Sequence, residues 1–398
     1  MDCTVANVKA FLEGKAHPCG ERAVKRCVII SDSFKGTLSS LEICKIARET
    51  IPAFLPGCQV EAIPVADGGE GMVDCFAEAV GAEKTAVSVH GPHGEVLTAC
   101  YGRKGPLAIV EMAAAAGLPL VGEIRDPEKT TTFGVGELIR HAVEHGCREI
   151  MLGLGGSATN DGGCGCAAAL GAVFYNAQGE PFVPVGGTLG EIERIDLSGV
   201  RERLDGVRLT AMCDVDNPLC GPNGAACVFA PQKGADAAMV ERLDRGLCHL
   251  DSVLQRTLGH SFAGVPGAGA AGGMGAGCLA FLGGRLRSGI EAVLDAVEFD
   301  RRLEGADFVI TGEGRIDSQS FHGKVLSGVA RRTRERNIPL IAIGGGILPE
   351  AEEAYKQGVT AMFSINRQPM PLRDSAPCTA ENYRRTLEDI CRLLAAFY

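Results

Sequence analysis

The chain has 398 residues, is 46% hydrophobic and carries a formal net charge of −10 at pH 7. This length exceeds what one core usually supports, so we expect two domains with sizeable buried interiors. An acidic chain lacks the basic surface that nucleic acids and anionic membranes require, which excludes both as partners. We find neither a signal peptide nor the roughly 20 apolar residues of a membrane span, and expect a cytoplasmic protein. Assembly into a homo-oligomer stays open.

The 17 cysteines are scattered along the chain without a C-x-x-C pair. We interpret them as small buried thiols of a reducing compartment. The regular spacing of Cys213, Cys220 and Cys227 is interrupted by prolines that one helix cannot contain. We therefore expect no zinc site there.

A βαβα pattern opens the chain and predicts a parallel sheet. Strands are expected at 27–30 and 60–65, and helices follow each of them. Ser39 and Glu42 have the spacing of a capping box at the start of the first helix, and Pro52 is expected to end it. The second helix is expected at 72–80.

The rhythm changes near residue 83, where short strands around Val87 and Val96 flank a hairpin signal at 91–94. Further on, 135–143 has helical spacing, 150–152 and 209–213 are expected strands, and the second of these leads to Asp214. Residues 263–277 are almost all Gly and Ala, which suits a hinge, a ligand loop or closely packed backbone. The G-x-G-x-x-G match at 267–272 follows no predicted strand and is treated as accidental.

The parallel rhythm returns after Ser288 and Glu291, which again have capping-box spacing. Strands are expected at 307–310, 339–343 and 359–363, and a closing helix with an apolar stripe is expected to pack on the first domain. The simplest organisation is an α/β, doubly wound domain at 26–82 and 288–398, interrupted by an inserted domain at 83–287. Residues 1–25 form an N-terminal extension.

A glycine-rich run, Gly153–Gly163, lies between the strand at 150–152 and a small, apolar helix at 164–170. Glycines and a helix start turn backbone N–H groups toward one point, which suits phosphate oxygens. A carboxylate such as Asp161 beside phosphates indicates a metal ion between them. The run therefore predicts magnesium-dependent nucleotide chemistry.

Three charged, glycine-rich loops follow predicted parallel strands, and such loops converge at one sheet edge. They contribute the charged residues Asp32, Lys35, Asp67, Glu70, Glu313, Arg315 and Asp317. Plainer roles remain open for single residues: Asp32 and Asp67 as helix caps, Arg315 as a solvated charge, and Asp214 in an Asx turn. No Walker A motif and no protein-kinase H-R-D or D-F-G motif is present.

Five ordered motifs, in contrast, resemble those of the type I glycerate kinases. They are 31–36, 65–71, 153–163, 213–219 and 311–319. The resemblance implies ATP-dependent phosphorylation of D-glycerate at the 2-hydroxyl, giving 2-phosphoglycerate and ADP. It also implies a Rossmann-like parallel-sheet domain with a second α/β domain of mixed sheet inserted. Two departures are the extension over the first 25 residues and Ser31, where many members have proline.

On this reading ATP, D-glycerate and Mg²⁺ are the small-molecule partners, and each site residue has an expected role. The loop would hold ATP phosphates through Gly155, Gly156, Ser157, Asn160 and Gly162. Asp161 and Asp214 would place magnesium. Lys35 and Arg315 would neutralise the carboxylate or the moving phosphoryl group, and Asp67, Glu313 or Asp317 would accept the hydroxyl proton.

Two other functions stay in view. A nicotinamide-dependent oxidoreductase of a small hydroxy acid would need an acidic ribose-binding residue roughly 20 residues beyond the third glycine of 267–272, after a strand. Glu291 has about that spacing but lies in an expected helix. A non-catalytic sugar-acid sensor would have lost the acidic loop residues, and all of them are present.

Overall fold

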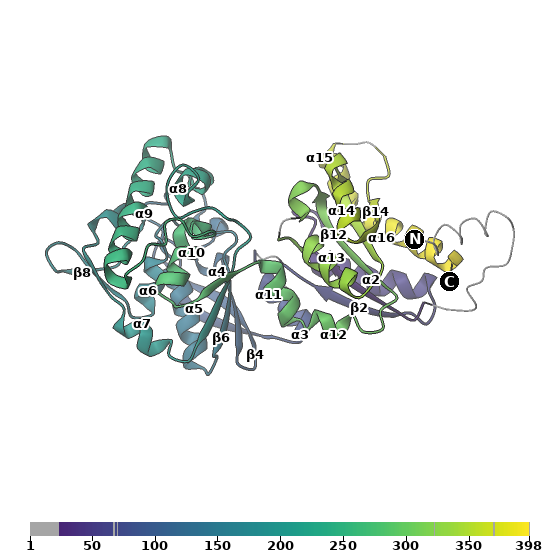
Figure 1. Cartoon of the computed structure of the whole chain (residues 1–398), viewed down its shortest axis with the longest axis horizontal. Helices are drawn as coiled ribbons and strands as arrows, with labels where there is room; N and C mark the ends of the chain where they lie inside the picture. Colours follow the sequence, from purple (N-terminus) through teal and green to yellow (C-terminus); the bar gives the residue numbers. More distant parts are fainter. Residues whose placement is uncertain (1–23, 67, 70, 322, 369–370, 398) are drawn as a thin grey trace. The chain divides into compact units, whose positions relative to one another are not determined.

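A computed structural model describes residues 24–66, 68–69, 71–321, 323–368 and 371–397. It contains two compact units (Figure 1). Unit 1 comprises the described residues up to Ala62, Arg301–Ile316 and the chain from Ala330 onward; unit 2 comprises Ile63–Asp300 and Asp317–Val329. The insertion expected at 83–287 lies inside unit 2, which begins earlier and ends later. Most of residues 1–25 lies outside the described part.

Unit 1 is built on a five-stranded sheet in the order β14-β13-β12-β1-β2. The strands β1, β12, β13 and β14 pair in parallel, as the sequence predicts. Their bounds, with that of β2, are β1 Arg26–Ser31, β2 Gln59–Pro64, β12 Phe308–Ile316, β13 Leu340–Ile347 and β14 Val359–Ser364.

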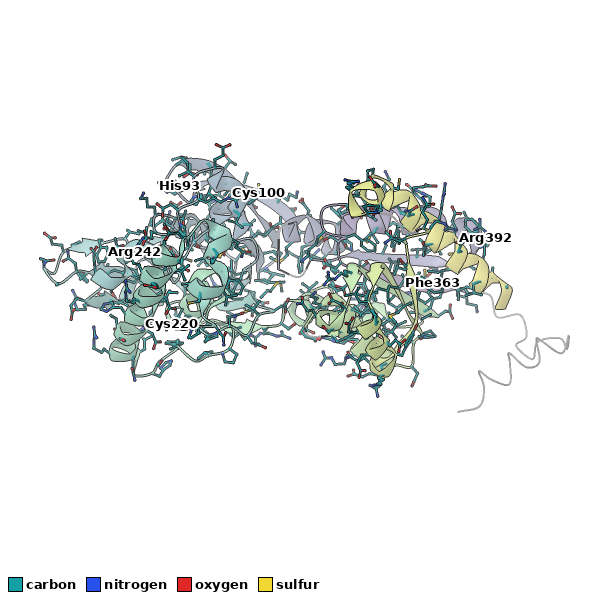
Figure 2. All side chains as sticks on the ribbon, turned by 90° about the horizontal axis from the view of Figure 1, so that it is seen from above. His93, Cys100, Cys220, Arg242, Phe363 and Arg392 are labelled. Carbon is teal, nitrogen blue, oxygen red and sulfur yellow. The ribbon has the colours of Figure 1, made fainter. Side chains whose placement is uncertain are left out.

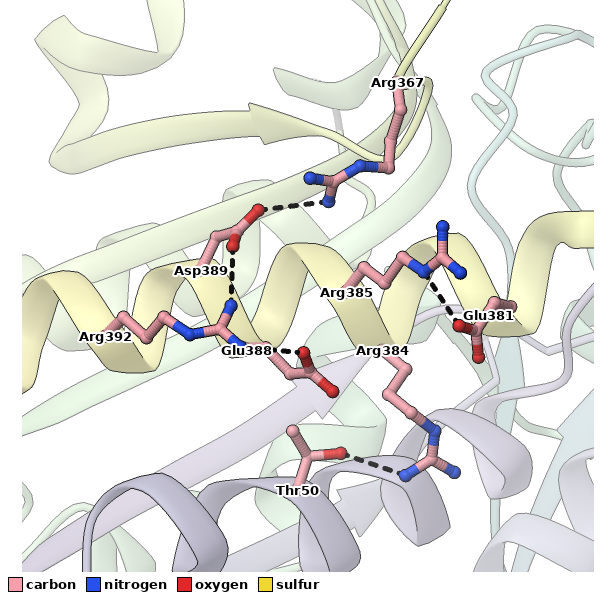
Figure 3. Close-up of polar contacts among 8 residues, drawn as sticks. All are labelled: Thr50, Arg367, Glu381, Arg384, Arg385, Glu388, Asp389 and Arg392. Carbon is pink, nitrogen blue, oxygen red and sulfur yellow. Dashed lines mark hydrogen bonds and ion pairs between the residues drawn. The ribbon is translucent and has the colours of Figure 1, made fainter.

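Two helices, α2 (Ser40–Phe54) and α16 (Thr379–Phe397), pack against each other and share one core with the sheet. The predicted capping box is confirmed: the backbone N–H of Glu42 donates to Ser39 Oγ, and that of Ser39 donates to the Glu42 carboxylate. Pro52 lies inside α2 and does not end it. Arg384 of α16 donates to Thr50 of α2 at 3.2 Å (Figure 3), which confirms that the closing helix packs on this domain.

The glycine-rich stretches that follow the predicted strands at 307–310 and 339–343 belong to the strands β12 and β13. The loop expected from Thr311 continues β12, where Arg315 pairs with Gly346 of β13. The reason is close backbone approach, because a methyl group at Gly312 would overlap Ile343 O and one at Gly345 would overlap Gly314 O. Here glycine permits a tight strand pair rather than a turn.

Unit 2 contains a six-stranded mixed sheet in the order β11-β10-β6-β5-β4-β3. The predicted hairpin is confirmed: β3 (Glu83–His90) and β4 (Val96–Lys104) pair antiparallel around a turn that holds His93 (Figure 2). The strands β5 (Leu107–Glu111), β6 (Glu149–Gly153), β10 (Arg208–Met212) and β11 (Arg285–Arg287) form the parallel part. A three-stranded sheet joins β7 (Val173–Tyr175), β8 (Pro181–Phe182) and β9 (Arg194–Asp196).

Helices α3 (Met72–Val80) and α11 (Gly289–Ala296) explain why unit 2 is larger than the predicted insertion. The first packs on β4 and β5, and the second packs on β10, so both are assigned by contact to the second sheet. Chain order had placed them with the first sheet.

The remaining helices include none, among the described residues, that is long and apolar enough to span a membrane. In unit 2 they are α4 Ala113–Ala116, α5 Phe133–Glu144, α6 Cys164–Ala169, α7 Ser198–Arg203, α8 Ala225–Phe229, α9 Ala237–Leu258 and α10 Ala270–Ala280. Also present are α12 Phe299–Arg302, α13 Val325–Glu335, α14 Glu353–Gln357 and α15 Leu372–Ser375. All cysteines in the described ranges are free, and most are buried; Cys220 and Cys100 are among the partly exposed ones (Figure 2).

Candidate active site

Two of the predicted glycine loops lie against each other in unit 2. The Gly153–Gly163 loop connects β6 to α6, and its Gly155 N–H donates to Gly68 O at 3.0 Å. A methyl group at Gly155 would come within 2.7 Å of Gly69 Cα. The Ala158 N–H donates to Ala116 O at 2.8 Å. The Gly155 N–H is thus committed to the protein, and the glycine serves close packing.

Asp161 is fully buried and organises the loop from within. Its Oδ2 accepts from the Thr132 N–H and hydroxyl, both at 2.8 Å, and from the Gly165 N–H at 3.2 Å. Its Oδ1 accepts from the Gly163 N–H at 3.1 Å. Burial raises the pKa of this carboxyl group, and the hydrogen bonds oppose that shift. A carboxylate whose oxygens already accept four hydrogen bonds from protein donors does not fit a magnesium ligand, so this predicted role does not fit the structure.

The Gly/Ala tract is closely packed backbone inside unit 2, which decides among the three readings of 263–277. Ala271, Gly272 and Gly273 have left-handed backbone angles, with φ of 54°, 68° and 89°. The Gly162 N–H donates to Gly272 O at 3.1 Å, and a methyl group at Gly272 would overlap Thr159 O. The tract holds the loop in place and contains no boundary between the units. The 267–272 match follows no strand.

Three predicted phosphate-binding residues remain in the middle of the loop: Gly156, Ser157 and Asn160. Asn160 has no exposed surface, and neither polar atom of its amide has a hydrogen-bond partner among the described residues. The neighbouring Thr159 Oγ1 is also buried and unpartnered in that part of the chain. Because buried polar groups are nearly always paired, these atoms indicate a segment built to meet a polar group that the described residues do not supply.

Lys233 was not predicted to belong to this site. It ends the short 3-10 helix η3 (Pro231–Lys233), is 2% exposed, and donates to Ser157 Oγ at 3.0 Å and Thr159 O at 2.6 Å. Burial lowers the pKa of its ammonium to about 7, and the charge of Asp161 opposes that shift. No motif marks Pro-Gln-Lys-Gly as special, so the sequence carried no signal for it.

Asp214, the second predicted magnesium ligand, is exposed and lies two residues after the end of β10. Its Oδ1 accepts from the Gly289 N–H at 2.8 Å, at the start of α11. The predicted cap by Ser288 does not form, and the Ser288 hydroxyl donates to Gly323 O instead. An exposed carboxylate suits magnesium chemically. Within the described ranges, no group of three or more His, Cys, Asp or Glu side chains is placed to hold a metal ion.

Glu111 also escaped prediction. Its carboxylate, at the end of β5, accepts from the Val73 N–H at 2.6 Å and the Gly71 N–H at 3.3 Å. It thereby caps α3, whose own N-cap residue provides no side-chain bond. The signal was present: an acidic residue ends a buried strand.

In unit 1, Asp32 and Lys35 lie in the loop that follows β1, as predicted, whereas Glu313 and Arg315 lie within β12 and not in a loop after it. Asp32 follows β1 and accepts from the Ser33 N–H at 2.7 Å, and Lys35 is exposed in the turn beyond it. On β12, Glu313 is buried and Arg315 is exposed. Asp317, in unit 2, accepts from the Gln319 N–H at 2.9 Å at the start of η4 (Ser318–Phe321). Asp67 lies outside the described residues.

Comparison with known proteins identifies the family of this chain. Residues 27–395 match the glycerate kinase family. The chain belongs to the glycerate kinase family. It is 46% identical over 368 residues to a glycerate kinase of Bacillus cereus, covering 92% of this chain and 97% of that one. It is 44% identical over 371 residues to the glycerate 2-kinase of Escherichia coli, covering 92% and 95%.

A known crystal structure has the same fold as this member of the glycerate kinase family. It is that of a candidate glycerate kinase 2 from Salmonella typhimurium LT2, with a TM-score of 0.84 and 43% identity over 94% of this chain and 99% of that one. The resemblance drawn from five sequence motifs is therefore confirmed, and so is the α/β fold with its parallel five-stranded sheet and second mixed sheet.

Proposed function

We propose that the protein is an ATP-dependent kinase that phosphorylates D-glycerate at its 2-hydroxyl, giving 2-phosphoglycerate and ADP. Similarity to glycerate kinases along nearly the whole chain carries this proposal. The same similarity favours phosphoryl transfer over the oxidoreductase and sensor alternatives. The choice of the 2-hydroxyl follows the name of the E. coli relative.

In the reaction, the glycerate 2-oxygen forms a bond to the γ-phosphorus of ATP while the bond from that phosphorus to the β–γ bridging oxygen breaks. The hydroxyl proton passes to a carboxylate, and ADP leaves. Positioning and charge neutralisation provide most of the catalysis of such transfers. The residues proposed here are assigned to those tasks.

For phosphate binding we assign Gly156, Ser157 and Asn160. The buried amide of Asn160 has no hydrogen-bond partner among the described residues, and Gly156 has a left-handed backbone conformation and, as a glycine, no side chain. Gly155 and Gly162 support the loop, since their N–H groups donate to Gly68 O and Gly272 O. Asp161 supports it too, through its four hydrogen bonds.

Magnesium enters with ATP as part of the substrate, and when bound it neutralises charge on the phosphate oxygens. Asp214 is the exposed carboxylate that we assign to it. Lys35 and Arg315, both exposed, are assigned to the glycerate carboxylate or the transferred phosphoryl group. The proton acceptor is one of Asp67, Glu313 and Asp317.

Phosphorus NMR of the product formed by purified protein from D-glycerate, ATP and MgCl₂ tests the reaction. The resonance of 2-phosphoglycerate is expected; the 3-phosphate would contradict the proposed position, and no glycerate-dependent ADP would contradict the proposed activity.

Asp214→Asn tests the metal assignment. The amide oxygen still accepts from the Gly289 N–H, so we expect an unfolding midpoint close to that of the wild type, while turnover falls about 100-fold, the scale on which lost electrostatic stabilisation acts. Asp216→Asn, which changes an exposed carboxylate two residues away, is the matched control. Full turnover by Asp214→Asn would remove it from the site.

A further inference from the structure

Lys233 is a buried cation that contacts the loop at two points. Its Nζ donates to Ser157 Oγ at 3.0 Å and to Thr159 O at 2.6 Å, and its side chain is almost without solvent contact. The lysine is held there by a tight turn: Gly234 has φ of 100°, and a methyl group at Gly234 would overlap Arg125 O. Burying a lysine is costly, so a surface role does not account for it.

The direction of the Lys233–Ser157 bond follows from the chemistry of the two groups. An ammonium donates only, whereas a hydroxyl has one O–H to donate and lone pairs to accept. Ser157 Oγ must therefore accept from Lys233, which leaves its own proton for another acceptor. No other side-chain bond of Ser157 is present in the described part of the chain. The lysine thus leaves the Ser157 hydroxyl able to donate to a further group.

Two residues close to Ser157 also offer hydrogen-bond donors to an anionic ligand. The Asn160 amide and the Thr159 hydroxyl are buried without partners in the described ranges and offer further donors. The positive charge of Lys233 adds to the potential at this loop, since charges act strongly where water is excluded. Asp161, the ionisable side chain whose charge acts on Lys233, is already saturated by four donors.

We propose that Lys233 is a positioning residue that fixes the Ser157 hydroxyl as a donor to an anionic oxygen of the substrates, either an ATP phosphate or the glycerate carboxylate. The inference rests on the function proposed above. It assigns a function to Lys233, a residue outside the five family motifs: the lysine makes the Ser157 hydroxyl of the loop a hydrogen-bond donor to the substrate.

Titration of Lys233 adds a signature that a purely structural lysine would not have. Its pKa is lowered to about 7 by burial, with Asp161 opposing. Above that pH the neutral amine has a lone pair and can accept from Ser157, which turns the hydroxyl inward. Anion affinity should therefore fall as the pH rises through about 7.

Calorimetric titration tests this with ATP alone and D-glycerate alone, so that binding is separated from turnover. The proteins are the wild type, Lys233→Arg, Lys233→Met and Ser157→Ala. Arginine stays charged at every pH in the experiment. The ratio of the affinity of the wild type to that of Lys233→Arg therefore cancels any effect of titration of the ligand itself. Lys129→Met, which removes an exposed lysine, is the control.

We expect Lys233→Met and Ser157→Ala to lose about tenfold or more in affinity for one of the two ligands at pH 6, as is typical when a bond to a charged group is lost. The ligand that is affected identifies the source of the anionic oxygen. Between pH 6 and 9 the wild type should weaken relative to Lys233→Arg. If Lys233→Met does not fold, two other results test the proposal. They are the affinities of Ser157→Ala and the pH dependence of the affinity of the wild type relative to that of Lys233→Arg.

Unchanged affinities for both ligands, or a ratio of wild type to Lys233→Arg that does not vary with pH, would overturn the role of Lys233. Wild-type protein that binds ATP but transfers no phosphate to glycerate would overturn the proposed function alone. The two failures are therefore distinguishable.

Discussion

The two glycine-rich segments that the sequence describes in the same way, Gly153–Gly163 in unit 2 and the stretch from Thr311 in unit 1, have different structures. The first is a true loop, supported by Asp161, Lys233 and the Gly/Ala tract. The second continues β12 and pairs with the glycines of β13.

The difference shows that glycine serves two physical needs which look identical in a sequence. In the loop, positive φ angles at Gly156, Gly162 and Gly163 require it. In unit 1 the backbone is extended, and glycine is required because a side chain would strike the next strand. Phosphate binding is thus proposed for the first segment, and display of Glu313 and Arg315 on a strand for the second.

The largest expected effect comes from Gly272→Ala, which would break the support of the loop. The left-handed backbone and the overlap with Thr159 O together should lower the free energy of unfolding by about 3 kcal/mol. Urea unfolding measures this. Gly264→Ala, in the same tract but with open space around it, should have a midpoint like that of the wild type. Equal midpoints for both variants would show that the tract does not hold the loop.

Asp161→Asn should have the next largest effect, because an amide offers one acceptor oxygen where the carboxylate accepts four bonds. We expect a loss of about 2 kcal/mol in the free energy of unfolding, from donors left unsatisfied. The exposed Asp205→Asn is the control. A variant as stable as the wild type but unable to use magnesium would instead restore the metal role originally predicted.

Gly345→Ala tests the other side of the comparison in unit 1. The methyl group would overlap Gly314 O across the strand pair, so we expect a loss of about 1–2 kcal/mol, the range for overpacking. Gly346→Ala is the neighbouring control, since its methyl group would meet only Arg315 Cγ at 3.7 Å. A harmless Gly345→Ala would mean that close strand approach does not explain these glycines.

Much of the local structure could be predicted because it depends on local signals. The Ser39–Glu42 capping box, the hairpin at 91–94 and the strand before Gly153 all follow from residues within a few positions of one another. The second capping box failed because the Ser288 hydroxyl donates to Gly323 O, which is distant in sequence, while Asp214 accepts from the Gly289 N–H at the start of the same helix. The boundaries of the units differed from expectation because α3 and α11 are assigned by contacts with distant strands.

The candidate site divides along the same line. Its residues in glycine-rich motifs were predictable, because charged side chains directly after buried strands indicate chemistry at a sheet edge. Lys233 and Glu111 were not predicted, and only long-range contacts, with Ser157 and Thr159 or with the start of α3, reveal their roles. Asp161 was predicted to bind magnesium, and its burial among protein donors shows that it supports the loop instead.

By itself, the sequence determined the family, the α/β class, the order of most strands and helices, and the segments that carry charge. Only the tertiary structure decided which glycines turn the chain and which let strands meet, and which carboxylates are saturated by protein donors. The physical reason is range: propensity and capping act between neighbouring residues, whereas burial, steric overlap and the pairing of polar groups depend on what folding brings into contact.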